Sequence, residues 1–246
     1  MKDQFRAEWS KAWSDPVTPW VLVGIVVSTV GVSALAVSAA RCPAAGCGQD
    51  PAKLSLTGIY LGQALAALAG VLAIGNEYGT GMIRVTLTAM PRRGRLLAAK
   101  ALVLTASVLV ASVLAVGGSM LAGLLTLPGH WFGAAEWRAS FCTTMYLTFI
   151  AVLSLGVTTV IRDSAVAIGG ALGLLYLFPV VASLVRDPTI QRRLEQIGPM
   201  FAGLDSQATT GLRGLPLAPW QGLGVVALWT AGTLVLGGLV LGLRDA

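Results

Sequence analysis

Six stretches of this 246-residue sequence contain no Asp, Glu, Lys or Arg. They cover residues 17–40, 54–75, 101–127, 139–161, 164–185 and 220–243. A helix that crosses the hydrocarbon core of a bilayer needs about 20 apolar residues, and each stretch is long enough. Charged residues make up only 11% of the chain, against roughly 25% in soluble domains. The sequence therefore predicts an all-α integral membrane protein, with six transmembrane helices in one domain (1–246).

The segment 1–16 predicts an amphipathic helix that lies in the membrane surface. Phe5, Trp9 and Trp13 recur every four residues and share one stripe of a helix, while Lys11 lies elsewhere. A disordered tail and a cleaved signal peptide are the alternatives. The apolar run that follows is longer than a signal-peptide core, which disfavours the second of these.

The distribution of cations predicts the orientation. Six spans put both termini on one side, and ten Lys and Arg residues fall on that side: Lys2, Arg6, Lys11, Arg84, Arg92, Arg93, Arg95, Lys100, Arg162 and Arg244. Seven fall on the other side, and four of these lie in one long loop, 186–219. Cytoplasmic loops of membrane proteins are enriched in Lys and Arg, so we expect cytoplasmic termini. The excess of cations, +6 overall, needs no nucleic-acid partner.

The two larger outer loops have distinct features. Cys42 and Cys47 could form a disulfide or remain free thiols, and the sequence favours neither. In the extracellular loop 186–219, Asp187 before a proline is typical of a helix start. We expect a short helix up to Ile197 and a second one over 201–212, so that this loop caps the outer mouth.

Several kinds of chemistry are absent from the sequence. There is no G-x-x-x-x-G-K-[ST] motif, so the chain does not bind ATP through a P-loop. The three cysteines and one histidine show no metal-ligand spacing, and no catalytic triad can be assembled. The spans carry no charged residue, which disfavours an ion-coupled carrier. We therefore expect neither enzymatic activity nor a cofactor in this chain.

The polar residues inside the spans are uncharged. Tyr60 and Gln63 are three residues apart and share a face of the second span. Tyr146 lies on the fourth span and Tyr176 on the fifth. These groups could line a path, or they could form hydrogen bonds between helices.

A basic island, residues 76–100, separates the second and third spans. It holds one acid, Glu77, and five cations: Arg84, Arg92, Arg93, Arg95 and Lys100. Apolar residues such as Ile83 and Met90 are interspersed. The pattern predicts a segment at the membrane surface that docks onto a partner; an ordinary basic cytoplasmic loop is the alternative. Because a buried acid is costly in a bilayer, we expect Glu77 at the cytoplasmic end, facing Arg84, another cation or the partner.

The residues of this island resemble the motif of the ABC type-2 transporter permeases. The resemblance rests on Glu77, Tyr78, Gly79, Thr80, Leu87, Pro91, Arg92, Arg95 and Lys100. One departure is that no additional residue separates Tyr78 from Gly79. The order of the elements is also similar to that family: a basic amphipathic start, six spans and a long outer loop before the sixth.

The resemblance implies a permease subunit of an ATP-driven exporter in a bacterial plasma membrane. Two permease copies would pair with two cytoplasmic subunits that hold ATP and Mg. Residues 76–95, together with Lys100, would couple the chain to the ATPase. The substrate path would run along the second and fifth spans, with Tyr60, Gln63, Tyr176 and Phe178 as candidates. The mild polarity suits a hydrophobic or amphipathic small molecule, lipid or natural product. A membrane scaffold or sensor that transports nothing is the alternative.

Overall fold

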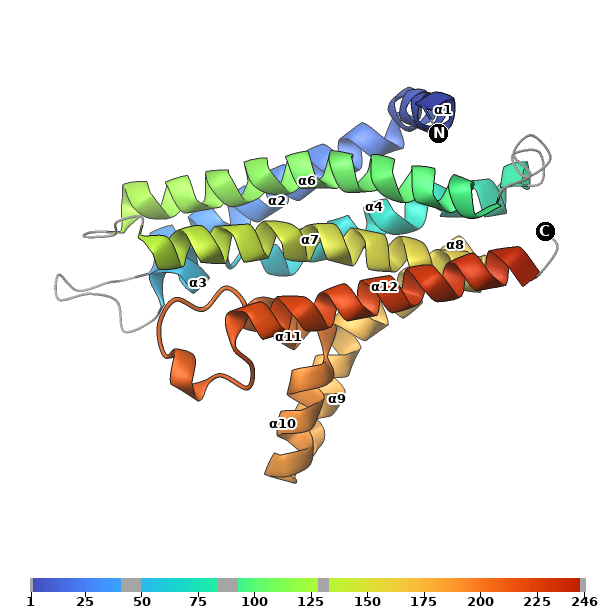
Figure 1. The fold of residues 1–246 in the computed structure, drawn as a ribbon. Coiled ribbons are helices and arrows are strands. Elements are labelled where there is room, and N and C mark those ends of the chain that lie inside the picture. The colour runs from blue at the N-terminus through green and yellow to red at the C-terminus, as the bar shows by residue number, and fades with distance from the viewer. Residues whose placement is uncertain (1, 41–49, 84–92, 128–132, 244–246) are drawn as a thin grey trace.

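The structure is a computed structural model that describes the chain except for residues 1, 41–49, 84–92, 128–132 and 244–246 (Figure 1). In the described part, every regular element is a helix, and six helices are long and apolar enough to cross a membrane. These spans are α2 (Val17–Ala39), α4 (Ile59–Gly79), α6 (Arg93–Thr126), α7 (Ala134–Ile161), the interrupted helix α8–η1–α9 (Ser164–Leu184) and α12 (Pro219–Leu243). The predicted all-α membrane fold is confirmed.

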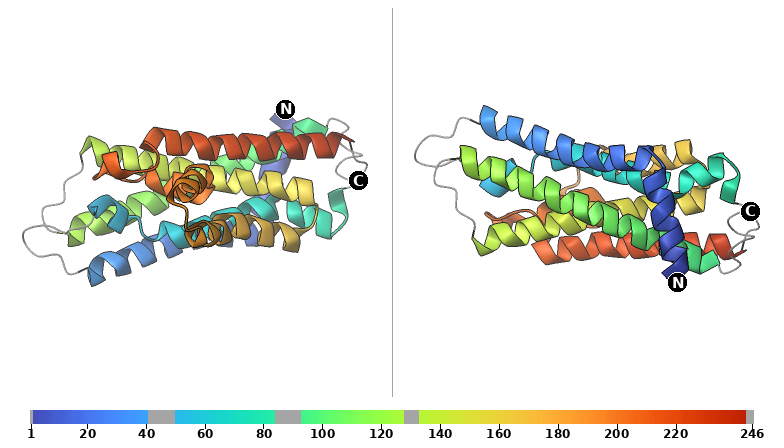
Figure 2. Two further views of the ribbon diagram at one scale, coloured as in Figure 1. Left: turned by 90° about the horizontal axis from the view of Figure 1, so that it is seen from below. Right: turned by 90° about the horizontal axis from the view of Figure 1, so that it is seen from above.

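Short helices complete the structure: α1 (Lys2–Ser14), α3 (Pro51–Ser55), α10 (Pro188–Ile197), α11 (Pro199–Asp205) and η2 (Leu212–Gly214). Apart from α9, the spans run along one common axis, and α1 crosses them at one end of the bundle (Figure 2). The last turn of α12 lies at this same end, as an even number of spans requires (Figure 1). Helices α3 and α11 lie toward the opposite end.

The core is built around α7, which packs against α12, α4, α6 and α8. Two glycines permit these close contacts. A Cβ atom at Gly70 of α4 would collide with the carbonyl oxygen of Ala151 of α7, and one at Gly156 of α7 would meet Thr233 of α12. Small residues at such crossings let membrane helices approach closely and pack by van der Waals contact.

The second span starts later than the sequence suggests. Asp50 accepts hydrogen bonds from the backbone N–H groups of Ala52 and Lys53, and Pro51 occupies the first helical turn, so a separate short helix, α3, forms. Helix α4 begins only at Ile59 and continues to Gly79. Because α4 continues past the charge-free run to Gly79, Glu77 lies inside the last turn of the span.

The fifth span is interrupted close to Pro179. The helix changes at η1 (Gly173–Leu177), a π-helical turn that directly precedes α9 (Phe178–Leu184). There the N–H of Phe178 donates to the carbonyl of Gly173, five residues back. Pro179 has no N–H to give to the carbonyl four residues earlier, which leaves the preceding turn free to widen. Beyond this turn, α9 leaves the bundle axis and projects sideways with α10 (Figure 1).

The loop 186–219 contains both expected helices. Asp187 caps α10 by accepting from the N–H groups of Thr189 and Ile190, and α10 ends at Ile197, as predicted. The second helix was predicted over 201–212 but occupies Pro199–Asp205. Pro199 restarts the helix directly after the extended residue Gly198, because a proline is well suited to the first helical turn.

Candidate functional site

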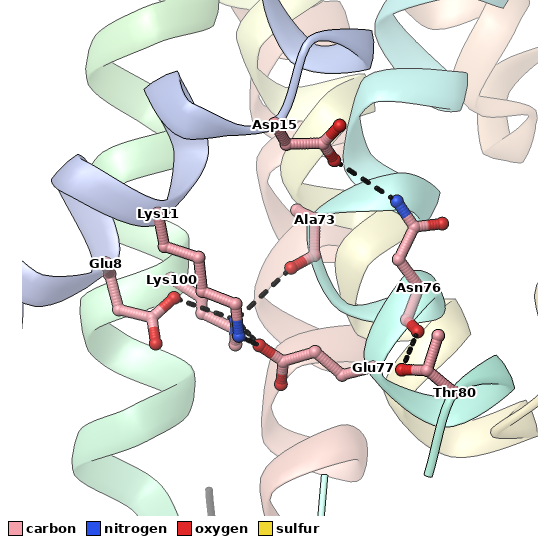
Figure 3. A network of polar contacts seen from close by, with 8 residues as sticks. All are labelled: Glu8, Lys11, Asp15, Ala73, Asn76, Glu77, Thr80 and Lys100. Atoms are coloured by element: carbon pink, nitrogen blue, oxygen red, sulfur yellow. Dashed lines mark hydrogen bonds and ion pairs between the residues drawn. The ribbon is translucent and has the colours of Figure 1, made fainter. Parts of the chain in front are cut away.

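The described residues form one buried cluster of charges, at the bundle end that α1 crosses (Figure 3). Lys100, in the second turn of α6, is only 4% exposed. Its ammonium donates to Glu8 of α1 at 2.8 Å, to Glu77 of α4 at 2.7 Å and to the carbonyl of Ala73 at 3.3 Å. An ammonium has three N–H groups, and each has an acceptor here.

The cluster has a second cation and a polar neighbour. Lys11 of α1 also pairs with Glu77, so two ammonium groups neutralise the carboxylates of Glu8 and Glu77. Next to them, the side-chain amide of Asn76 donates to Asp15, the residue between α1 and α2, at 3.4 Å. Only Lys11 of the two lysines reaches water substantially, with 41% of its side chain exposed.

The geometry links three elements that are far apart in sequence. Glu8 is 92 residues from Lys100, and Glu77 is 23 residues from it. Removal of one partner from a buried pair is strongly destabilising, by about 3–5 kcal/mol, because it leaves an uncompensated charge. The cluster therefore holds α1 against the end of α4 and the start of α6. A movement of α1 would be transmitted to both spans.

The structure agrees with one expectation for Glu77 and adds partners to it. Glu77 lies at the end of its span and faces cations, as the energetic cost of a buried acid predicts. The cations are Lys100 and Lys11; Arg84, the other proposed partner, lies outside the described residues. Sequence analysis missed two members of the cluster: Lys11, which pairs with Glu77, and Glu8, which pairs with Lys100. Their spacing of three residues, on the side of α1 away from the Trp9 and Trp13 stripe, was the available signal.

The other residues of the predicted coupling segment fall into two groups. Tyr78, Gly79 and Thr80 end α4, where Thr80 is the C-cap and its hydroxyl donates to the carbonyl of Asn76 at 2.8 Å. Arg95 is exposed in the first turn of α6. Leu87, Pro91 and Arg92 lie, with Arg84, in the part of the chain that is not described, as do Cys42 and Cys47.

A second polar group lies deep in the bundle. Tyr146 of α7 is fully buried, and its hydroxyl donates to the side-chain oxygen of Gln63. Tyr176, in the π-helical turn, donates to the backbone carbonyl of Tyr60. The amide nitrogen of Gln63 is buried without a partner among the described residues. Three predicted path residues thus gather where the fifth span is interrupted, together with Tyr146.

Phe178, the fourth predicted path residue, is next to this group in sequence but has a different neighbour. Its ring lies against Gly198, where a Cβ atom would come within 2.6 Å of it. Gly198 separates α10 from α11, so Phe178 helps to fix the helical hairpin of the outer loop.

A third polar group connects two segments at the opposite end of the bundle: the start of α3 and the loop after α11. The carboxylate of Asp50 accepts from the N–H of Thr209 at 2.6 Å, from its hydroxyl at 2.6 Å and from the N–H of Thr210 at 2.9 Å. Burial alone would raise the pKa of Asp50, but these hydrogen bonds outweigh it and lower the pKa below its ordinary value of 3.8. Arg138 donates to the carbonyl of Ala208 at 2.6 Å and secures the same loop to α7.

Comparison with protein-family models gives no match, and comparison with the curated proteins gives no significant match. The function is therefore inferred from the residues and from the geometry described above. That geometry defines a multi-pass membrane protein whose N-terminal helix, α1, is joined to two spans by buried ion pairs.

Proposed function

We propose that this chain is the permease subunit of an ATP-binding-cassette transporter, driven by ATP that a separate subunit hydrolyses. One observation carries the proposal: Lys100 joins Glu8 of α1 and Glu77 of α4 in a buried cluster. Helix α4 ends at Gly79, two residues after Glu77, and α6 begins at Arg93, seven residues before Lys100. A partner that pushes on the connection between these helices, or on α1, would act on two spans at once.

The composition of the described spans supports an external energy source. They contain no charge in mid-membrane of the kind that ion-coupled carriers use, and the sequence has no P-loop. The E-Y-G-T run at the end of α4 resembles the corresponding part of ABC type-2 permeases. On this proposal, two copies of the chain assemble with two cytoplasmic ATP-binding subunits in a bacterial plasma membrane, and the complex exports a hydrophobic or amphipathic compound.

Orientation is part of the proposal and has its own test. Ser10 and Thr210 are both exposed. Ser10 belongs to α1, at one end of the bundle, and Thr210 bonds to Asp50, the N-cap of α3, which lies toward the opposite end. Single cysteines at these positions, in a chain without its native cysteines, are treated with a membrane-impermeant maleimide on intact cells. We expect labelling at 210 only; equal labelling at both positions would contradict cytoplasmic termini.

The function is tested by purification and reconstitution. The chain is isolated from its native membrane with its associated proteins, and the complex is placed in lipid vesicles. We expect an ATP-binding subunit in the complex, and ATP-dependent movement of a lipophilic dye that requires both proteins. A chain that forms no complex with an ATPase, or a complex that hydrolyses ATP but moves none of a panel of amphiphiles and lipids, would favour the scaffold alternative.

A further inference from the structure

The ion-pair cluster forms the floor of a cavity of about 130 Å³ between α2, α4 and α6. The wall above the floor is apolar and includes Leu22 of α2, Ala69 and Leu72 of α4, and Val103 of α6. Along α4 this wall extends from Asn76 to Ala69, roughly 10 Å at the helical rise of about 1.5 Å per residue. The cavity thus has a charged floor near the end of the spans and a mainly apolar interior farther along them.

The mouth of the cavity lies between α2 and α4. Leu22 and Leu72 are only partly buried, whereas Val103 and the other α6 residues of the wall are buried. A molecule could therefore enter sideways from the membrane. For scale, an engineered protein cavity of about 150 Å³ holds benzene. The space suits a polar head with the first few carbons of an apolar body.

The charges of the floor determine which head fits. Three carboxylates line the cavity, those of Glu8, Asp15 and Glu77, against two ammonium groups, those of Lys11 and Lys100. The lining therefore carries one more carboxylate than ammonium groups. A cationic N–H donor forms a charge-assisted hydrogen bond with a carboxylate, so this floor favours a cationic head.

We propose that this cavity binds a cationic amphiphile, a protonated amine on an apolar body, taken from the membrane. The ammonium lies at the floor, near the carboxylates of Asp15 and Glu77, and the first carbons lie along Leu72 and Val103. An anionic head is excluded because it would add to an excess of negative charge. The inference goes beyond the proposed function and does not rest on it, since binding is a property of this chain alone.

Photolabelling tests the site. The full chain in lipid nanodiscs is exposed to a long-chain primary amine that carries a diazirine near its nitrogen, and the labelled peptides are identified by mass spectrometry. A carboxylic acid and an alcohol of the same chain serve as matched probes. We expect saturable labelling of the α2 and α4 peptides by the amine, at least about tenfold above the acid, since hydrogen bonds to charged groups are strong.

Two variants locate the binding. Glu77→Gln removes the charge, and we expect it to reduce amine labelling about tenfold or more without affecting the alcohol. Ala69→Leu fills the apolar wall without altering the ion pairs and should abolish labelling by the amine. Its control is Ala64→Leu, which changes a separate cavity between α4 and α8 and should leave labelling intact.

Two outcomes would overturn the inference: equal labelling of the α2 and α4 peptides by the amine and the acid, or full amine labelling of Ala69→Leu. The Ala69→Leu variant tests the binding site even if Glu77→Gln does not fold. Neither outcome bears on whether an ATPase binds the chain, so a failure here is distinct from a failure of the proposed function.

Discussion

At the level of single residues, Lys100 has the most demanding environment of the described cations. It is buried, and two carboxylates depend on it for compensation. We expect Lys100→Met, which keeps the length of the side chain, to lower the free energy of unfolding by about 3–5 kcal/mol. Thermal unfolding in detergent, followed by loss of helical signal, measures the effect as a lower midpoint.

The control for Lys100 is Lys53, which is 40% exposed in its side chain and lies 4.0 Å from Asp205. An exposed ion pair contributes at most about 1 kcal/mol, so Lys53→Met should change the midpoint little. Equal effects of the two substitutions would show that the cluster at α1 does not hold the helices together.

We expect the contact of Asp50 with Thr209 and Thr210 to depend on pH. A lowered pKa means that the folded state prefers the ionised carboxylate, so the contact stabilises above the ordinary value of 3.8 and weakens as pH falls through the lower folded value. At neutral pH, Asp50→Ala should raise amide exchange at Thr209 and Thr210 about tenfold or more, since a hydrogen bond to a charged group contributes roughly 1.5–3 kcal/mol.

Hydrogen–deuterium exchange with mass spectrometry measures this change on the peptide that contains both threonines. Asp187→Ala is the matched control, because Asp187 caps only α10 and has no bond to Thr209 among the described contacts. Unchanged exchange in Asp50→Ala would show that the loop is held by other contacts, of which Arg138 to Ala208 is the strongest candidate.

At the level of helices, the crossing of α4 and α7 depends on Gly70. A Cβ atom there would collide with the carbonyl of Ala151, which belongs to a backbone that cannot move aside cheaply. Overpacking of this kind costs about 1–3 kcal/mol, so Gly70→Ala should lower the unfolding midpoint. Gly117→Ala on α6 is the control: nothing lies near its Cβ position, and alanine favours a helix over glycine.

The sequence predicted the helices well where one physical effect dominates. A charge-free run of about 20 residues has no stable alternative in a bilayer, so all six spans were found. The ends were less accurate because local capping decides them: Asp50 and Pro51 create α3 and displace the start of α4. The π-helical turn was missed, because a proline indicates a kink but not which preceding turn absorbs it.

The candidate site was predicted in part for a related reason. Glu77 and Lys100 lie in one segment of the sequence, and their charges alone suggested a site. Glu8 comes from a helix 92 residues away from Lys100, and nothing local shows that α1 crosses the start of α6. Likewise, Tyr146 resembles any polar residue of a buried helix until Gln63 is seen opposite its hydroxyl.

At the level of the whole molecule, the α9–α10 hairpin projects from the side of the bundle (Figure 1). Leu177, Val181 and Leu184 are 61%, 52% and 74% exposed, so the single chain leaves an apolar face uncovered. The proposed pairing of two copies would cover this face. A single cysteine at Val181, in a cysteine-free chain, should then cross-link between copies in membranes.

A cysteine at Ala171 is the control for cross-linking, because this residue is 1% exposed on α8 and should not reach a second copy. The cross-linked product is read as a dimer band that disappears on reduction. Absence of cross-links at Val181, together with a single copy per complex, would contradict the paired arrangement and would leave α9 facing lipid.

The proposed function requires that the Glu77 cluster couples the chain to ATP hydrolysis. The most direct measurement compares ATP hydrolysis and cargo movement in vesicles that contain the complex with either normal Glu77 or Glu77→Gln. Loss of the Glu77 charge leaves a buried cation without its partner, which costs several kcal/mol and weakens the link between α1 and the two spans. We therefore expect transport to fall at least about tenfold while the ATP-binding subunit stays bound. Glu136→Gln, which changes a residue that accepts from the N–H of Gly133 at the start of α7, should transport normally. Normal transport by a folded Glu77→Gln complex would contradict the account.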